Sequence, residues 1–153
     1  MDVKMKLALE SVDEADPMPP FCVEAPTPLG EVLDSLAEHH GGVLVCHQGM
    51  LVGVFTERDA LKALADRVSM DTPVGTLMTV SPVTARRETS LAAAVRKMAV
   101  GGYRRLPLLD ESSRPCGVVT TSGLVHYLVE HYARTIYNLP PQPRGAAVER
   151  DGA

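Results

Sequence analysis

Residues 53–61 read GVFTERDAL, and residues 117–125 read GVVTTSGLV. Each stretch begins as an apolar strand, reaches a threonine at its fourth position and continues into an apolar helical pattern. The segments that precede them are also similar, because residues 19–37 and 81–99 both place apolar side chains at i, i+3, i+4, i+7 and i+8. Such self-similarity predicts one structural unit that occurs twice in the chain.

The predicted unit is β-α-β-β-α, and its first helix follows from an apolar stripe. The stripes are Leu29, Val32, Leu33, Leu36 and Ala37 in the first unit and Leu91, Ala94, Val95, Met98 and Ala99 in the second. Thr27 before Pro28 predicts a helix N-cap, and Thr89 holds the corresponding place. Two strands and a polar turn come next, and the last helices are predicted over 57–67 and 121–136. The predicted fold class is therefore α+β, in layers.

The repeats also set the expected domain boundaries. We expect an N-terminal segment over 1–16, a first repeat over 17–70, a second repeat with a linker helix over 71–137, and a Pro-rich flexible tail over 138–153. The linker helix is predicted to begin at Asp71-Thr72-Pro73-Val74, a cap followed by a proline. A unit of about 60 residues barely buries its own core, so the two repeats should pack together.

Composition limits the classes of function. The chain has 153 residues, 45% of them hydrophobic but only 4% aromatic, so the core should be aliphatic. A net charge of −4 argues against a general nucleic-acid binder. The charge is uneven, with −7 over residues 1–70 and +3 over 71–153. Two interpretations remain open: two solvated faces of different sign, or an anion site in the second half.

The cysteines and the apolar runs indicate the compartment. The three cysteines are far apart and form no C-x-x-C pair, so we expect reduced thiols rather than disulfides or a structural zinc site. Charged residues interrupt the N-terminus, and no apolar run approaches membrane-spanning length. From the sequence we expect a cytoplasmic protein without a membrane segment.

Several fragments, in this order and spacing, carry a family resemblance. Besides the two stretches quoted first, they are DTPVGTLMT (71–79), PVTARRETSL (82–91) and GGYRRLPLLD (101–110). Over about residues 19–132 the chain resembles a pair of CBS domains, also called a Bateman module, as found in small stand-alone bacterial CBS-pair proteins. The resemblance implies two tandem repeats packed as a pseudo-two-fold pair. It also implies a regulatory module without catalysis, no obligatory cofactor, a homodimer and an unknown downstream protein partner.

The resemblance further implies a ligand. CBS pairs bind adenosine-containing compounds in clefts between the repeats, so AMP, ADP or ATP is expected, with NAD or S-adenosylmethionine possible. Thr56 and Asp59, three residues apart at a strand-to-helix turn, fit two interpretations. They form something close to a capping box, or they bind the two hydroxyls of a ribose, as the matching residues do in the family. Both roles can coexist.

The same family pattern assigns the rest of the first nucleotide site. Its adenine slot would have Val54 on one wall and Val83, Thr84 and Ala85 on the other. Arg104 and Arg105 would reach the phosphates, since arginine pairs with two oxygens at once; the alternative is an exposed basic strand end. For Arg58, phosphate contact and exposed surface are equally open.

The second repeat departs from the pattern. Its cleft would be lined by Cys22, Val23, Val43, Val118 and Thr120. Gly123 stands where the acid should be, and Gly41 and Gly42 stand where the second repeat has its two arginines. This second cleft is therefore expected to be weak or empty, which predicts one nucleotide per chain.

Other classes of function are alternatives to the nucleotide sensor. A structural interaction protein with degenerate clefts is the main alternative, and Gly123 is the feature that favours it. Cys46 and His47 lack metal-ligand spacing, so no metal is expected, and no catalytic motif is present. For the homodimer, we expect the helices of the stripes Leu29–Leu36 and Leu91–Met98 to pack across a two-fold axis.

Overall fold

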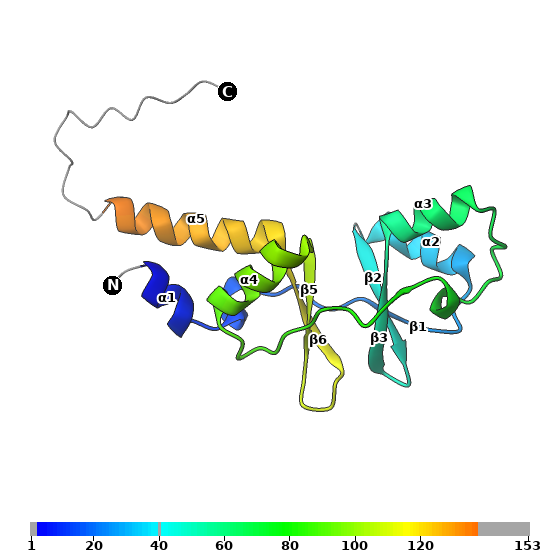
Figure 1. Ribbon diagram of the computed structural model, residues 1–153, viewed down its shortest axis with the longest axis horizontal. Helices are drawn as coiled ribbons and strands as arrows, with labels where there is room; N and C mark the ends of the chain where they lie inside the picture. The colour runs from blue at the N-terminus through cyan, green and yellow to red at the C-terminus, as the bar shows by residue number, and fades with distance from the viewer. Residues whose placement is uncertain (1–2, 40, 138–153) are drawn as a thin grey trace, which may run out of the picture.

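The computed structural model describes residues 3–39 and 41–137, and the predicted tail over 138–153 lies outside the described residues. Two β-α-β-β-α repeats lie next to each other, each with its helices on one side of a small sheet (Figure 1). The first repeat comprises β1 (Cys22–Glu24), α2 (Leu29–Glu38), β2 (Gly42–His47), β3 (Met50–Thr56) and α3 (Glu57–Ala65). The second comprises α4 (Leu91–Gly101), β5 (Arg105–Leu109), β6 (Pro115–Thr120) and α5 (Thr121–Tyr137). The predicted α+β class with two tandem repeats is confirmed.

Two short segments precede the repeats. Before the first lie α1 (Val3–Leu9) and the 3-10 turn η1 (Val12–Ala15), and before the second lie the 3-10 turn η2 (Val74–Thr76) and β4 (Thr79–Val80). The first strand of the second repeat is only a single parallel bridge, between Ala85 and Leu108. The linker therefore contributes a strand and a short turn, and the helix predicted to begin at Asp71 amounts to the three residues of η2.

Each sheet is completed by the segment that leads into the other repeat. β4, which leads into the second repeat, pairs antiparallel with β3 of the first. Met18, which leads into the first repeat, pairs with Val118 of β6 through two backbone hydrogen bonds of 2.8 and 2.9 Å. A glycine makes room at both places: a Cβ on Gly53 would lie 2.8 Å from the Thr79 carbonyl oxygen, and one on Gly117 would lie 3.2 Å from Pro17 Cβ. The repeats are thus joined crosswise as well as in sequence.

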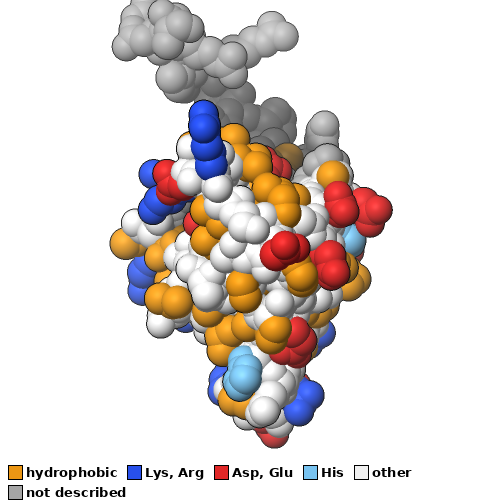
Figure 2. Space-filling view, turned by 90° about the vertical axis from the view of Figure 1, so that its right-hand side faces the viewer, with side chains coloured by type: hydrophobic (Ala, Val, Ile, Leu, Met, Phe, Trp, Pro, Cys, Tyr) orange, Lys and Arg blue, Asp and Glu red, His pale blue; other side chains and the backbone are white. Residues whose placement is uncertain are grey.

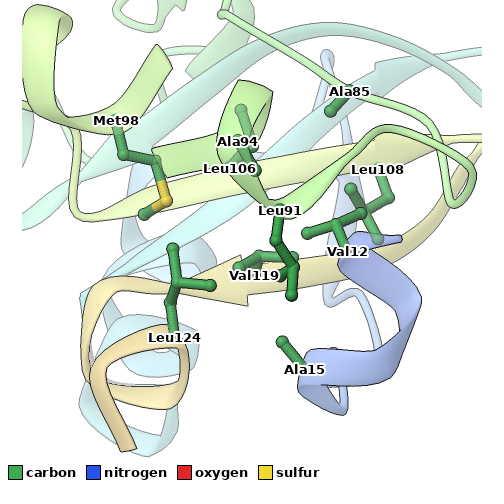
Figure 3. Close-up of a cluster of buried hydrophobic side chains, with 10 residues drawn as sticks. All are labelled: Val12, Ala15, Ala85, Leu91, Ala94, Met98, Leu106, Leu108, Val119 and Leu124. Atoms are coloured by element: carbon green, nitrogen blue, oxygen red, sulfur yellow. The ribbon is translucent and has the colours of Figure 1, made fainter. Parts of the chain in front are cut away.

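The hydrophobic cores follow the same crosswise arrangement. One core lies in the first repeat and includes Leu29, Phe55 and the linker residue Val74. The other lies in the second repeat and includes Val12 and Ala15 from η1 (Figure 3). The N-terminal segment therefore packs against the second repeat, far from it in sequence, and both cores are almost wholly aliphatic, as the composition predicts.

The helix starts differ from those predicted. Pro28, in extended conformation, precedes α2 and provides no side-chain cap, so the prediction of Thr27 as the N-cap is wrong. Instead, linker carbonyls accept the first helical N–H groups: Leu29 N donates to Thr72 O at 2.9 Å and Gly30 N to Met70 O at 2.9 Å. Because the linker satisfies these donors, no capping side chain is needed. In the second repeat Ser90, not Thr89, caps α4.

The predicted dimer stripes are not available for contact with another chain. In α2, Leu29 and Val32 are 0% exposed, and in α4 Leu91 is 0% exposed, because each stripe packs into the core of its own repeat. The expectation that these stripes pack across a two-fold axis is therefore wrong. Apolar side chains that are exposed on the helices lie at other positions.

The crosswise core gives a stability prediction. Val12→Ala removes two buried methyl-sized groups from the second core and should lower the free energy of unfolding by about 1.5–3 kcal/mol. Val100→Ala is the matched control, because Val100 is 84% exposed and its loss should change stability by less than about 0.5 kcal/mol. Urea unfolding followed by circular dichroism measures both. Equal stabilities of the two variants would mean that η1 is not part of the folded core.

Candidate functional site

Thr56 and Asp59 form a complete capping box at the start of α3. The Thr56 hydroxyl accepts a hydrogen bond from Asp59 N at 3.4 Å, and Asp59 Oδ2 accepts one from Thr56 N at 2.9 Å. The Thr56 hydroxyl also donates to Asp59 Oδ2 at 3.1 Å. The capping interpretation of the T-x-x-D spacing is confirmed. It uses one oxygen of the carboxylate, Oδ2.

A third residue, Thr79, reaches the same carboxylate from the linker. Its hydroxyl donates to Asp59 Oδ1 at 3.1 Å and to Oδ2 at 3.3 Å. Thr79 lies there because β4 pairs with β3, which sets Thr79 opposite Val54. No local pattern marks this residue in the sequence, since its role depends on a pairing between strands about 25 residues apart.

The carboxylate can therefore hold the helix and still accept further hydroxyl groups. Asp59 Oδ1 takes part in the shared Thr79 hydrogen bond but in no bond of the capping box. A carboxylate oxygen accepts two hydrogen bonds, so Oδ1 has capacity for another donor. Capping and the binding of a hydroxylated ligand use different oxygens and do not exclude each other.

The predicted apolar walls come from both repeats. Val54 is paired with Leu44 in the first sheet, on the face opposite the helices, and is partly buried. Ala85 belongs to the second sheet and is buried against Leu108. β4 ends at Val80, five residues before Ala85, a span of at most about 17 Å. The short stretch from Thr79, opposite Val54, to Ala85 thus connects the two walls as it crosses from the first repeat to the second.

The segment of the second wall also has a cation next to it. Lys97 Nζ on α4 donates a hydrogen bond of 2.8 Å to the Thr84 carbonyl oxygen, and Val83 packs against the second core. Lys97 is not among the predicted site residues. A signal was present, because Lys97 lies between Ala94 and Met98 on the exposed side of a clear amphipathic helix.

Arg105 lies at the beginning of α3, although it belongs to the second repeat. A Cβ on Gly41 would lie 2.5 Å from Arg105 Nη2, so the guanidinium rests directly on the Gly41 backbone. Gly41 N in turn donates to Glu57 Oε1 at 3.0 Å, and Gly42 pairs with Thr56. Gly41 also has a φ of 100°, a backbone conformation that side-chain-bearing residues rarely adopt and glycine adopts readily.

Groups of both signs meet at this helix start, whose first turn carries the carboxylates of Glu57 and Asp59. The N-terminus of α3 carries a partial positive charge, and the Arg105 guanidinium adds a full one. Among the described residues the ion pairs are Arg87–Asp13 and His126–Glu130, so no acid neutralises Arg105 through an ion pair. Arg104 and Arg58 are both exposed, and the Arg104 carbonyl oxygen accepts a hydrogen bond from Thr121 N at 2.9 Å.

The equivalent place in the second repeat has the cap but not the acid. Thr120 accepts a hydrogen bond from Gly123 N at 3.0 Å, as Thr56 does from Asp59 N. Gly123 supplies no carboxylate. Met18 pairs with Val118 as Thr79 pairs with Val54, and it has no hydroxyl, so the linker hydroxyl is also missing.

The residues predicted to line the second cleft do not all lie in one place. Val43 belongs to the first core and faces the helices, and Val23 packs against the same core. Cys22 is exposed, while Val118 is buried at the pairing with Met18.

The thiols of Cys22 and Cys46, on neighbouring strands, both stay protonated at neutral pH. Burial raises the pKa of Cys46 to about 12 and also raises the pKa of Cys22. Neither thiol is therefore activated as a nucleophile.

Within residues 3–39 and 41–137, no three His, Cys, Asp or Glu side chains come close enough to share a metal ion. In the same residues, none of the helices combines the length and apolar character that crossing a bilayer requires.

Known proteins are similar to this chain in sequence and in fold. The CBS domain family model matches residues 12–66 and 74–130. An uncharacterized 17.7 kDa protein of Acidianus ambivalens is 27% identical over 130 residues, which cover 84% of this chain and 79% of that protein.

Two solved structures have similar folds. The structure of CBSX2 in complex with AMP has a TM-score of 0.68 at 27% identity and covers 80% of this chain and 98% of that one. The CBS domain pair of protein MJ0100, in complex with 5′-methylthioadenosine and S-adenosyl-L-methionine, has a TM-score of 0.68 at 24% identity. It covers 76% of this chain and 98% of its own.

The capping box predicts a local stability effect. Thr56→Ala removes the hydroxyl that accepts from Asp59 N and should cost about 1 kcal/mol of unfolding free energy, within a range of roughly 0.5–2 kcal/mol. Thr56→Ser keeps the hydroxyl and should cost much less. Chemical denaturation of the three proteins measures the difference. If the serine and alanine variants lose equal stability, the methyl group of Thr56 rather than its cap is responsible.

Proposed function

This chain belongs to the CBS domain family, and on that premise we propose that it is a regulatory module that binds an adenine nucleotide at Asp59. CBS domain proteins are generally regulatory modules, and we further propose that this one senses its ligand without chemically changing it. Related CBS pairs have been crystallised with AMP and with S-adenosyl-L-methionine. These complexes support an adenosine-containing ligand for this chain.

One observation carries the proposal: the divided use of the Asp59 carboxylate. Oδ2 holds the helix start, while Oδ1 lies outside the capping box and is shared only with the Thr79 hydroxyl. A ribose presents two neighbouring hydroxyl groups, and both can donate to a carboxylate. In this proposal the ribose binds at Oδ1 and at the two threonine hydroxyls.

The charges favour a phosphorylated ligand. Arg105 lies against Gly41 at the positive end of α3, and helix N-termini bind phosphate well. Arg104, Arg58 and Lys97 are exposed cations on the surrounding segments. S-Adenosylmethionine carries a sulfonium cation, which these groups would repel. AMP, ADP or ATP is therefore our proposed ligand, ahead of NAD and S-adenosylmethionine.

Signalling requires two states with different affinities for the ligand. We propose that the chain acts in the cytoplasm as a homodimer and passes the signal to a downstream protein. The site draws residues from both repeats, so nucleotide would favour one relative position of the repeats over another. We propose one nucleotide per chain, because the second repeat lacks both the acid and the linker hydroxyl.

Replacement of Asp59 tests the ribose role. Asp59→Ala should weaken AMP binding by about 10- to 150-fold, since a hydrogen bond to a charged group contributes about 1.5–3 kcal/mol. Asp34→Ala is the control, because it removes an exposed acid from α2 and should leave the affinity unchanged. Titration calorimetry gives the affinity and the stoichiometry, which we expect to be one nucleotide per chain. Unchanged affinity in a folded Asp59→Ala protein would refute the site.

Replacement of the two arginines tests the phosphate role. In the Arg104→Gln, Arg105→Gln double variant, AMP binding should fall strongly while adenosine binding changes little. The difference between variant and unmodified protein should shrink as salt rises, because exposed charges are screened. Arg96→Gln, an exposed arginine on α4, serves as the control. Equal losses for adenosine and AMP would instead indicate damage to the apolar slot.

A further inference from the structure

A lysine of the second repeat contacts the backbone of the second wall of the predicted adenine slot. Lys97 Nζ donates a hydrogen bond of 2.8 Å to the Thr84 carbonyl oxygen. The next residue, Ala85, turns both of its backbone groups toward β5, since Ala85 N donates to Pro107 O at 3.0 Å and Leu109 N donates to Ala85 O at 2.9 Å. Backbone groups of successive residues in an extended segment point to opposite edges. The Thr84 carbonyl therefore faces the open edge, away from β5.

The N–H group that this open edge would offer beside the carbonyl already has a partner. It belongs to Arg86, and Arg86 N donates to Thr89 Oγ1 at 3.0 Å. The Lys97 ammonium is therefore the donor next to the Thr84 carbonyl. An ammonium has three N–H groups and a carbonyl oxygen accepts two hydrogen bonds, and the Lys97 side chain is exposed. An acceptor and a donor thus lie 2.8 Å apart, each with capacity for a ligand.

This pair of groups is complementary to one edge of adenine. That edge presents an amino group, which donates, next to the ring nitrogen N1, which accepts. The Thr84 carbonyl would accept from the amino group, and Lys97 would donate to N1. A 6-oxopurine presents an acceptor and a donor in the reverse order, so carbonyl would face carbonyl and N–H would face ammonium. We propose that Lys97 determines the base specificity of the nucleotide site, selecting adenine over a 6-oxopurine. The inference rests on the nucleotide site proposed above.

The first repeat has no counterpart of this lysine. Lys97 is the seventh residue of α4, and the seventh residue of α2 is Ser35, whose hydroxyl donates to Glu31 O at 3.2 Å within its own helix. The charged residues of α2 are all acidic. Figure 2 looks onto the first-repeat end and shows acidic side chains gathered toward its right-hand side. A base at the equivalent wall of the first repeat would find no ammonium, so Lys97 is one more group that distinguishes the two clefts.

AMP and IMP test the proposal, because they differ only in this edge of the base. By titration calorimetry the unmodified chain should bind AMP at least about tenfold more tightly than IMP. Lys97→Met keeps an unbranched side chain without the ammonium and should weaken AMP binding about tenfold, while IMP binding changes much less. Lys97→Arg should retain most of the preference, because a guanidinium also donates. Arg96→Met, which removes the neighbouring exposed cation, is the control and should leave both affinities unchanged.

The ratio of the two affinities decides the result. A purely structural role of Lys97 would weaken AMP and IMP equally, so an unchanged ratio in Lys97→Met would overturn the proposal, as would tighter binding of IMP by the unmodified chain. Asp59→Ala separates the base from the ribose, because it should weaken both nucleotides by the same factor. A chain that binds AMP and IMP alike would contradict the role of Lys97 and leave the proposed site standing. A chain that binds neither would contradict both.

Discussion

The exchange of edge segments between the repeats is the constraint on which the structure depends. A sheet edge with unpaired backbone groups is costly to bury and prone to pair with other chains. Here one edge of each hairpin is paired by the segment that leads into the other repeat, β4 on β3 and Met18 on Val118. The same exchange brings Val74 into the first core and Val12 into the second. Neither repeat has a complete sheet or a complete core without the chain that precedes the other.

This exchange also builds the candidate site. Asp59 has a threonine at its own helix start, as local sequence dictates, but the second threonine arrives on the linker strand. From there the chain continues directly to Ala85 in the second sheet. A ligand at Asp59 would therefore touch a segment that belongs to both repeats. Binding there could change how the repeats are held together without any other connection.

The sequence predicts features of the structure that depend on neighbours along the chain. The helical stripes, the α3 capping box and the two strand pairs follow from spacing within a few residues. The predictions that failed concern groups whose partners are remote. Thr27 does not cap α2 because linker carbonyls already accept hydrogen bonds from the first N–H groups of the helix. Thr79 could not be predicted, because only the pairing of β4 with β3 sets it beside Asp59. The direction of Arg105 could not be predicted either, because it depends on how the two repeats pack.

The asymmetry of the two repeats has a physical cause at their contact. The strands β2 and β5 begin close together, and the Arg105 guanidinium lies where a Cβ of residue 41 would be, at 2.5 Å from Nη2. A second large side chain at Gly41 would have no space, so only one repeat can place arginine here. The cation thus belongs to the second repeat, while the acid and the positive helix start belong to the first. The first site therefore has a cation at its helix start, whereas the second, with Gly123 and Met18, has neither the acid nor the linker hydroxyl.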